Sequence, residues 1–149
     1  MNKDIHFSAY HFFQKFFAPS QAVQAIIDEY ATSVTEKTVA VVVRTGWDDW
    51  QRFLLDWDPL KFPLCLNGWR ESGNLPKNVN VFVTSDREDV KAETVKKLRE
   101  MNFEVISLQD SATHVQTPDS ELKILKTIAE FHLISRTGYG LLTSSSLFG

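Results

Sequence analysis

The sequence predicts an α/β domain with a mostly parallel sheet of about four or five strands. Apolar segments of strand length alternate with amphipathic segments of helical length, which is typical of βα units joined by right-handed crossovers. The segment 39–43 is continuously apolar, as expected for a strand buried on both faces. Polar residues follow three of the expected strands, as they do where strands end at a ligand-binding edge. Together these observations predict a three-layer, Rossmann-like domain.

The length and composition fit one domain. The chain has 149 residues, which we divide into a helical lead-in over 1–36 and an alternating β/α core over 37–149. Its 16 basic and 19 acidic residues are interspersed and give a net charge of −3, so nucleic acid is not an expected partner. The single Cys65 excludes an intramolecular disulfide and is most simply a small buried hydrophobe.

No membrane segment is expected. No stretch of the sequence approaches the ~20 apolar residues of a membrane span. The amino terminus also lacks the basic and then apolar pattern of a signal peptide. We expect either a cytoplasmic chain or one whose targeting segment lies outside this sequence.

The first expected helix begins after Ser20, which can cap its amino terminus. Its apolar positions recur at three- and four-residue spacing and are Val23, Ile26, Ile27, Tyr30 and Val34. This helix leads into the strand over 39–43.

The second expected strand covers 79–84 and follows a long aromatic stretch. A Ser-x-x-Glu capping box formed by Ser85 and Glu88 then predicts the start of a helix. The apolar positions of this helix are Val90, Val95, Leu98 and Met101.

The remaining elements are a strand over 104–108, a helix and a last strand over 139–143. Thr117 and Pro118 set the start of the helix, after a loop that holds Asp110 and His114. Its apolar positions are Leu122, Leu125, Ile128, Ala129 and Leu133.

Arg44 is the first candidate binding residue. It falls where the strand over 39–43 leaves the sheet, and a planar guanidinium there suits a phosphate or carboxylate. Parallel strands bring their carboxyl ends to one edge, where hydroxyls and backbone N–H groups can converge on one anion. The polar residues expected at this edge are Arg44, Thr45, Thr84, Ser85, Asp86, Ser144, Ser145 and Ser146. The alternative is that Arg44 pairs with a structural carboxylate.

The order of these motifs resembles the donor-binding lobe of GT-B fucosyltransferases. The motifs are Val-x-Arg-Thr ending at Thr45, Val-Phe-Val-Thr-Ser-Asp ending at Asp86, and Thr-Ser-Ser-Ser-Leu-Phe-Gly over 143–149. The resemblance covers roughly residues 12 to 149 and includes the α1,2, α1,6 and protein O-fucosylating branches. It implies GDP-fucose as the donor substrate, inverting transfer to a glycan or protein, and no metal cofactor. A longer enzyme of this type would place the chain in the Golgi or ER lumen.

The resemblance also implies residue roles. Arg44 occupies the place of the arginine that grips the diphosphate, Asp86 matches the aspartate that reads the nucleoside, and the serines over 144–146 match a phosphate-contacting turn. The sequence departs from the family pattern at Val42, which stands where the family often has histidine.

The aromatic segment after Arg44 offers two further sites. Asp48 and Asp49 could supply the general base of inverting transfer, although solvated loop acids or partners of nearby arginines are the simpler interpretation. Asp56 and Asp58 form an Asp-x-Asp pattern that could hold Mg²⁺ or Mn²⁺, but apolar neighbours favour helix packing.

The expected partners are a nucleotide sugar and a second lobe or subunit that carries the acceptor site. We expect the docking surface around Trp47, Trp50 and Trp57, unless these side chains fill the domain's own core. The alternative function is a non-catalytic remnant that binds a nucleotide sugar or a protein.

Overall fold

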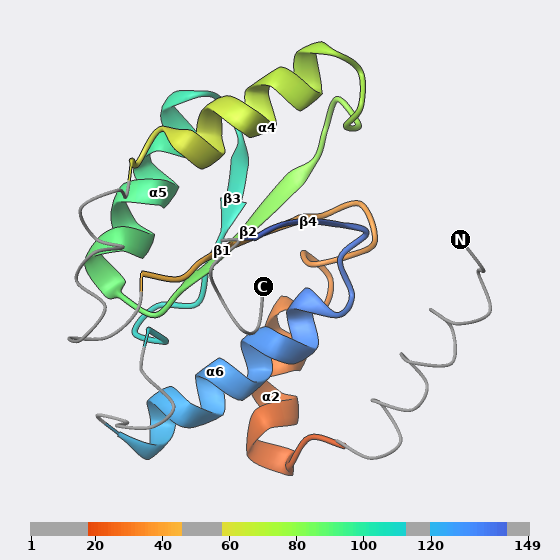
Figure 1. Ribbon diagram of the computed structural model, residues 1–149. Helices are drawn as coiled ribbons and strands as arrows, with labels where there is room; N and C mark the ends of the chain where they lie inside the picture. Colours follow the sequence, from red (N-terminus) through yellow and green to blue (C-terminus); the bar gives the residue numbers. More distant parts are fainter. Residues whose placement is uncertain (1–17, 46–57, 113–119, 143–149) are drawn as a thin grey trace.

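The structure is a computed structural model that describes residues 18–45, 58–112 and 120–142. The four strands in these residues form one sheet, and all of them run parallel (Figure 1). In sheet order β3-β2-β1-β4, they are β3 (Glu104–Ile106), β2 (Asn80–Ser85), β1 (Val39–Val43) and β4 (Tyr139–Leu142). The predicted parallel sheet is therefore confirmed.

Helices cover both faces of this sheet. Within the described residues they are α2 (Gln21–Tyr30), α4 (Lys61–Glu71), α5 (Glu88–Glu100) and α6 (Glu121–Ile134). Helices α4 and α5 lie on one face, and α2 and α6 lie on the other (Figure 1). This arrangement is the three-layer, Rossmann-like architecture that the alternating pattern predicts.

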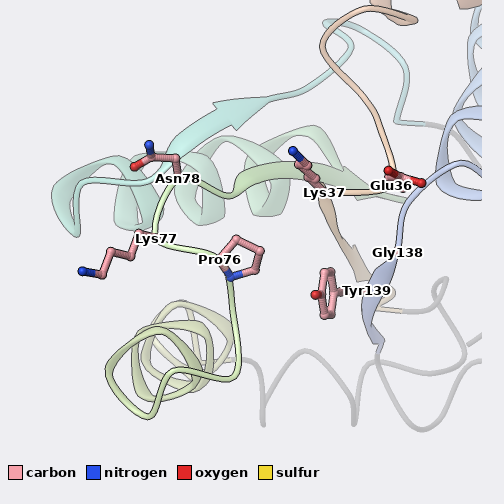
Figure 2. Close-up of a pocket in the computed structure, with 7 residues that line it drawn as sticks. All are labelled: Glu36, Lys37, Pro76, Lys77, Asn78, Gly138 and Tyr139. Carbon is pink, nitrogen blue, oxygen red and sulfur yellow. The ribbon is translucent and has the colours of Figure 1, made fainter.

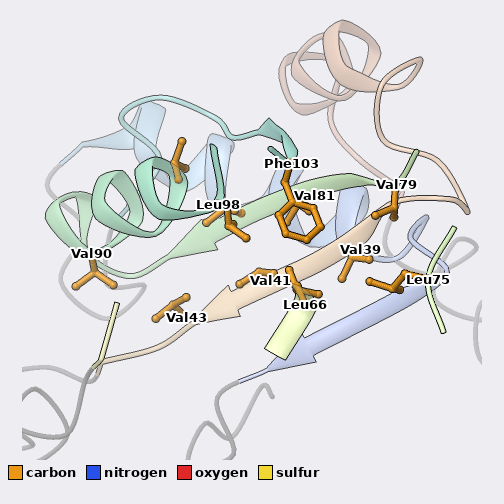
Figure 3. Packing of buried hydrophobic residues seen from close by; sticks show 12 residues of the cluster. Val39, Val41, Val43, Leu66, Leu75, Val79, Val81, Val90, Leu98 and Phe103 are labelled. Atoms are coloured by element: carbon orange, nitrogen blue, oxygen red, sulfur yellow. The ribbon is translucent and has the colours of Figure 1, made fainter. Parts of the chain in front are cut away.

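The larger core lies between the sheet and the pair α4 and α5 (Figure 3). Side chains alternate between the two faces of a strand, so the odd-numbered valines of β1 and β2 point to the same side. Leu66 of α4 and Leu98 of α5 pack against these valines and are fully buried. The valines are Val39, Val41, Val43, Val81 and Val83.

The second core lies under α2 and α6. Phe82 points to this side from β2 and is fully buried among Val23 and Ile27 of α2 and Leu133 of α6. The predicted cap is confirmed, because the Ser20 Oγ accepts a hydrogen bond from the Val23 N–H at 3.4 Å. The same alternation turns the even-numbered residues at the ends of β1 and β2 toward α6.

The predicted capping box is wrong. Ser85 belongs to β2, where it pairs with Val43, so the strand continues one residue past its expected end. Helix α5 starts at Glu88, and its N-cap residue Arg87 makes no side-chain capping hydrogen bond. The Ser85 Oγ instead accepts from the Arg87 N–H at 3.2 Å, which forms a turn between strand and helix.

The start of α6 also differs from the expectation. Ser120 is the N-cap, and its Oγ accepts a hydrogen bond from the Lys123 N–H at 3.3 Å. Thr117 and Pro118 lie outside the described residues. Leu122 and Ile128 are exposed, contrary to the apolar face assigned to them, because the buried face of α6 is centred on Ala129 and Leu133.

Two expected strand ends shift as well. β3 stops at Ile106, two residues before the predicted end. Leu108 nevertheless remains buried under the helices, since it packs in the second core. Residue 143, the expected end of the last strand, lies outside the described residues.

The sequence pattern did not predict α4. Its first turn contains Pro63, which is tolerated there because the first N–H groups of a helix have no intrahelical partner. Leu66 supplies the core contact of this helix, whereas Cys65 is partly exposed rather than buried as expected.

The strand order creates a topological switch point beside β1. The chain adds β2 and then β3 on one side of β1, and after α6 it returns to add β4 on the other side. Ligands of open α/β sheets bind outside the carboxyl ends of the strands at such a point. The fold therefore predicts a ligand site at the carboxyl ends of β1 and β4.

Candidate functional site

A cavity of about 110 Å³ lies at the carboxyl edge of the sheet, beside the switch point. Arg44, directly after β1, and Leu142, at the end of β4, both line it. Its other walls come from the ends of β1 and β2 and from α6. These residues are Val42, Thr84, Ser85, Thr127, Glu130, Phe131 and Ile134.

Asp86 joins the ends of β1 and β2. Its carboxylate accepts hydrogen bonds from the Thr45 N–H at 3.0 Å and 3.1 Å, and from the Thr45 hydroxyl at 3.2 Å. Both residues are buried. This contact fixes the backbone that carries Arg44, and it occupies the carboxylate that the family resemblance assigns to nucleoside recognition.

Glu130 is the acidic group of the cavity. It is 3% exposed, and its carboxyl accepts a hydrogen bond from the Thr84 hydroxyl at 2.6 Å and is bonded to the Ser111 hydroxyl. Burial raises the pKa of Glu130 to about 7, although the bonds to Ser111 and Thr84 and the charge of Lys91 act in the opposite direction. Such a group changes its charge near neutral pH.

Lys91 supports this carboxyl from α5. The ammonium donates to the Leu108 carbonyl at 2.6 Å and to the Ser111 hydroxyl at 2.9 Å, and it pairs with Glu88 at 2.8 Å. Lys91 is 2% exposed, so its ammonium has lost its hydrating water, and these three partners accept its hydrogen bonds instead. The polar groups therefore form a connected chain from α5 to the cavity.

The structure brings together part of the predicted site. Arg44, Thr84 and Ser85 line one cavity. Thr45 and Asp86, which follow Arg44 and Ser85 in the sequence, are hydrogen-bonded to each other. The other candidates lie outside the described residues, namely Asp48, Asp49, Ser144, Ser145 and Ser146. The proposed docking residues Trp47, Trp50 and Trp57 also lie there.

In the Asp-x-Asp pattern, only Asp58 belongs to the described residues. Asp58 accepts a hydrogen bond from the Leu60 N–H at 2.8 Å, which forms a local turn before α4. Asp56 lies outside the described residues. Among the residues that the structure describes, no group of three or more His, Cys, Asp or Glu side chains could hold a metal ion.

A larger hollow, of about 730 Å³, lies at the other ends of the strands, where they begin (Figure 2). Every residue that lines it is exposed, and Figure 2 shows the Lys77 side chain extending away from the Tyr139 ring. It lies beside the amino ends of the strands, where open α/β sheets do not bind their ligands. Despite its size, we therefore place the candidate site at the smaller cavity.

No protein-family model, curated protein or solved structure matches this chain. In the ranges that the structure covers, no helix has the length and apolar character needed to cross a membrane.

Neither Glu130 nor Lys91 was predicted from the sequence. A usable signal for Glu130 was its position in α6 between Ala129 and Phe131, three residues after Thr127. Thr127 and Glu130 share the helix face that turns toward the end of β2. Lys91 had no comparable signal, because a lysine in the first turns of a helix is ordinarily solvated.

Proposed function

We propose that this chain binds a nucleoside diphosphate sugar, GDP-fucose, at the carboxyl edge of its sheet. The observation that carries the proposal is the position of Arg44 on the wall of a cavity at the topological switch point. A guanidinium there can hold a diphosphate through paired hydrogen bonds. The choice of GDP-fucose among such ligands rests on the motif resemblance.

The neighbouring groups fit a phosphate ligand. The Ser85 hydroxyl lines the same cavity and can donate to a phosphate oxygen in place of its long hydrogen bond to Asp86, at 3.4 Å. The Thr84 hydroxyl also lines the cavity, but its proton is donated to Glu130. Asp86 has a positioning role in this proposal, since its carboxylate holds Thr45 and therefore the backbone next to Arg44. Guanine recognition would then use other groups.

For transfer, the bond between the fucose anomeric carbon and the diphosphate breaks while an acceptor oxygen attacks the opposite face. Arg44 would offset the charge that develops on the departing diphosphate. Asp48 or Asp49 would take the acceptor proton. The acceptor site would lie on a second lobe or subunit, and a chain that binds the donor without transfer would be the non-catalytic form of this function.

The test is isothermal titration calorimetry of the full 149-residue chain with GDP-fucose, GDP, UDP and NAD. We expect binding of the two guanine nucleotides and weaker binding of UDP and NAD. Amide chemical shifts would locate the ligand, with changes expected around Arg44 and Thr84 and not around Lys77 and Tyr139. Failure of both guanine nucleotides to bind would contradict the proposal.

A further inference from the structure

A basic residue, Arg44, and an acidic residue, Glu130, line the same small cavity. The arginine suits an anion, whereas an ionised carboxylate on the wall of the same cavity would repel that anion. The cavity therefore accepts a diphosphate at lowest cost when Glu130 is neutral.

The hydrogen bonds around Glu130 accommodate a neutral carboxyl. The Ser111 hydroxyl has one proton, and both the Leu108 carbonyl, at 3.1 Å, and Glu130 lie within its reach. If Ser111 donates to Leu108, it can accept from both Lys91 and a protonated Glu130. The other Glu130 oxygen still accepts from Thr84. Protonation of Glu130 thus leaves each of its polar neighbours, Lys91, Ser111 and Thr84, with a hydrogen-bond partner.

The charges that act on Glu130 in the structure are those of Lys91 and Glu88. Lys91 reaches it through Ser111 and favours the ionised form, whereas Glu88, also on α5, favours the neutral form. Arg44 faces the same cavity from the end of β1. Asp86, after β2, directs its carboxylate to Thr45. An anion bound at Arg44 would add a further negative charge and favour the neutral form.

We infer that Glu130 makes diphosphate binding at Arg44 depend on pH, because it must be a neutral carboxylic acid in the complex. Binding therefore takes up one proton from solvent when Glu130 is ionised beforehand. The proton resides between Glu130 and Ser111. This inference rests on the proposed function. Burial supports it, because it already brings the pKa of Glu130 to about 7 before any ligand is added.

The first experiment measures GDP-fucose affinity by calorimetry for the full chain and for Glu130→Gln. The sugar nucleotide is preferred to GDP because its diphosphate diester keeps a fixed charge through this range. Each pH unit above the pKa of Glu130 costs tenfold in affinity, so the wild-type affinity should fall about tenfold between about pH 6 and about pH 8. Glu130→Gln should keep the low-pH affinity at both values.

Glu104→Gln is the matched control, since Glu104 is an exposed carboxylate on β3, at the opposite side of the sheet from β4. It should show the wild-type pH dependence. Equal pH dependence in wild type and Glu130→Gln, or affinity that rises with pH, would overturn the inference and leave the proposed function standing. Absence of binding at every pH would overturn both.

A second measurement needs no variant. The binding enthalpy of wild type at about pH 8 is compared in two buffers with different ionisation enthalpies. Uptake of close to one proton per ligand supports the inference, and an enthalpy independent of the buffer overturns it.

Discussion

Arg44 gives the most direct test at the level of single residues. Arg44→Ala should weaken GDP-fucose binding by about 1.5–3 kcal/mol, the range of a charge-assisted hydrogen bond. Arg44→Lys should restore only part of this loss, since an ammonium lacks the paired donors of a guanidinium. Calorimetry measures both.

Arg136→Ala is the matched control for this prediction. Arg136 is exposed in the turn between α6 and the start of β4, away from the carboxyl ends of the strands. Its removal should therefore leave GDP-fucose affinity unchanged. Wild-type affinity in Arg44→Ala would show that the ligand binds elsewhere.

Glu130 should also make the stability of the domain depend on pH. Its pKa is about 7 in the folded chain and near 4.5 when unfolded, so the folded state favours the neutral form. The contribution of Glu130 to the free energy of unfolding should therefore be greatest below about pH 4.5. It should fall as pH rises through about 7, by on the order of 3 kcal/mol. Urea unfolding across this range measures the change.

Glu130→Gln should remove this contribution from the pH profile. The remaining slope reports the other titrating groups, so the difference between the two profiles is the quantity to compare. Parallel profiles for the wild type and the variant would show that Glu130 does not titrate as described.

At the level of elements, the turn between α6 and β4 depends on Gly138. A Cβ at this position would lie 2.1 Å from the Glu36 carbonyl oxygen, so the backbone would have to move. Gly138→Ala should lower the free energy of unfolding by about 1–3 kcal/mol, the cost of overpacking. Thermal and urea unfolding measure the loss.

Gly68→Ala provides a control of opposite sign. Gly68 lies inside α4, and a Cβ there would meet no atom within 4 Å. Alanine should therefore stabilise the helix, by about 0.5–1 kcal/mol. A loss of stability in this variant, or none in Gly138→Ala, would contradict the description of these elements.

Elements with strong periodic patterns could be predicted from the sequence, and elements fixed by tertiary contacts could not. The continuous apolar residues of β1 placed that strand correctly, and the spacing of Val23 and Ile27 placed the start of α2. Helix α2 ends at Tyr30, before the predicted helical position Val34, which is nevertheless buried in the second core. Helix α4 was missed because Pro63 and Gly68 weaken its helical pattern, while the burial of Leu66 depends on the sheet.

The candidate site was likewise predictable only in part. Arg44, Thr84 and Ser85 follow from the rule that parallel strands share one carboxyl edge. Glu130 comes from a helix far along the chain, and no local pattern shows that it packs against Thr84. The role of Asp86 also depends on a partner, Thr45, that only folding brings near.

For the molecule as a whole, the proposed ligand contacts need no metal. We expect GDP-fucose affinity to be unchanged when EDTA is added, because Arg44 supplies the charge and Arg44 and the Ser85 hydroxyl supply the donors. Calorimetry with EDTA and with added Mg²⁺ or Mn²⁺ tests this. Strict dependence on a divalent ion would instead implicate Asp56 and Asp58 and indicate a different class of transferase.

The position of β1 in the centre of the sheet has a consequence for synthesis on the ribosome. Of the four described strands, β1 comes first along the chain and β4 comes last. The two strands are neighbours in the sheet, with Val39 paired to Tyr139. During translation one edge of β1 therefore waits with unpaired N–H and carbonyl groups until β4 has emerged. An exposed edge of this kind can pair with another nascent chain. We therefore expect β1 to be the strand that most needs protection by a chaperone during synthesis.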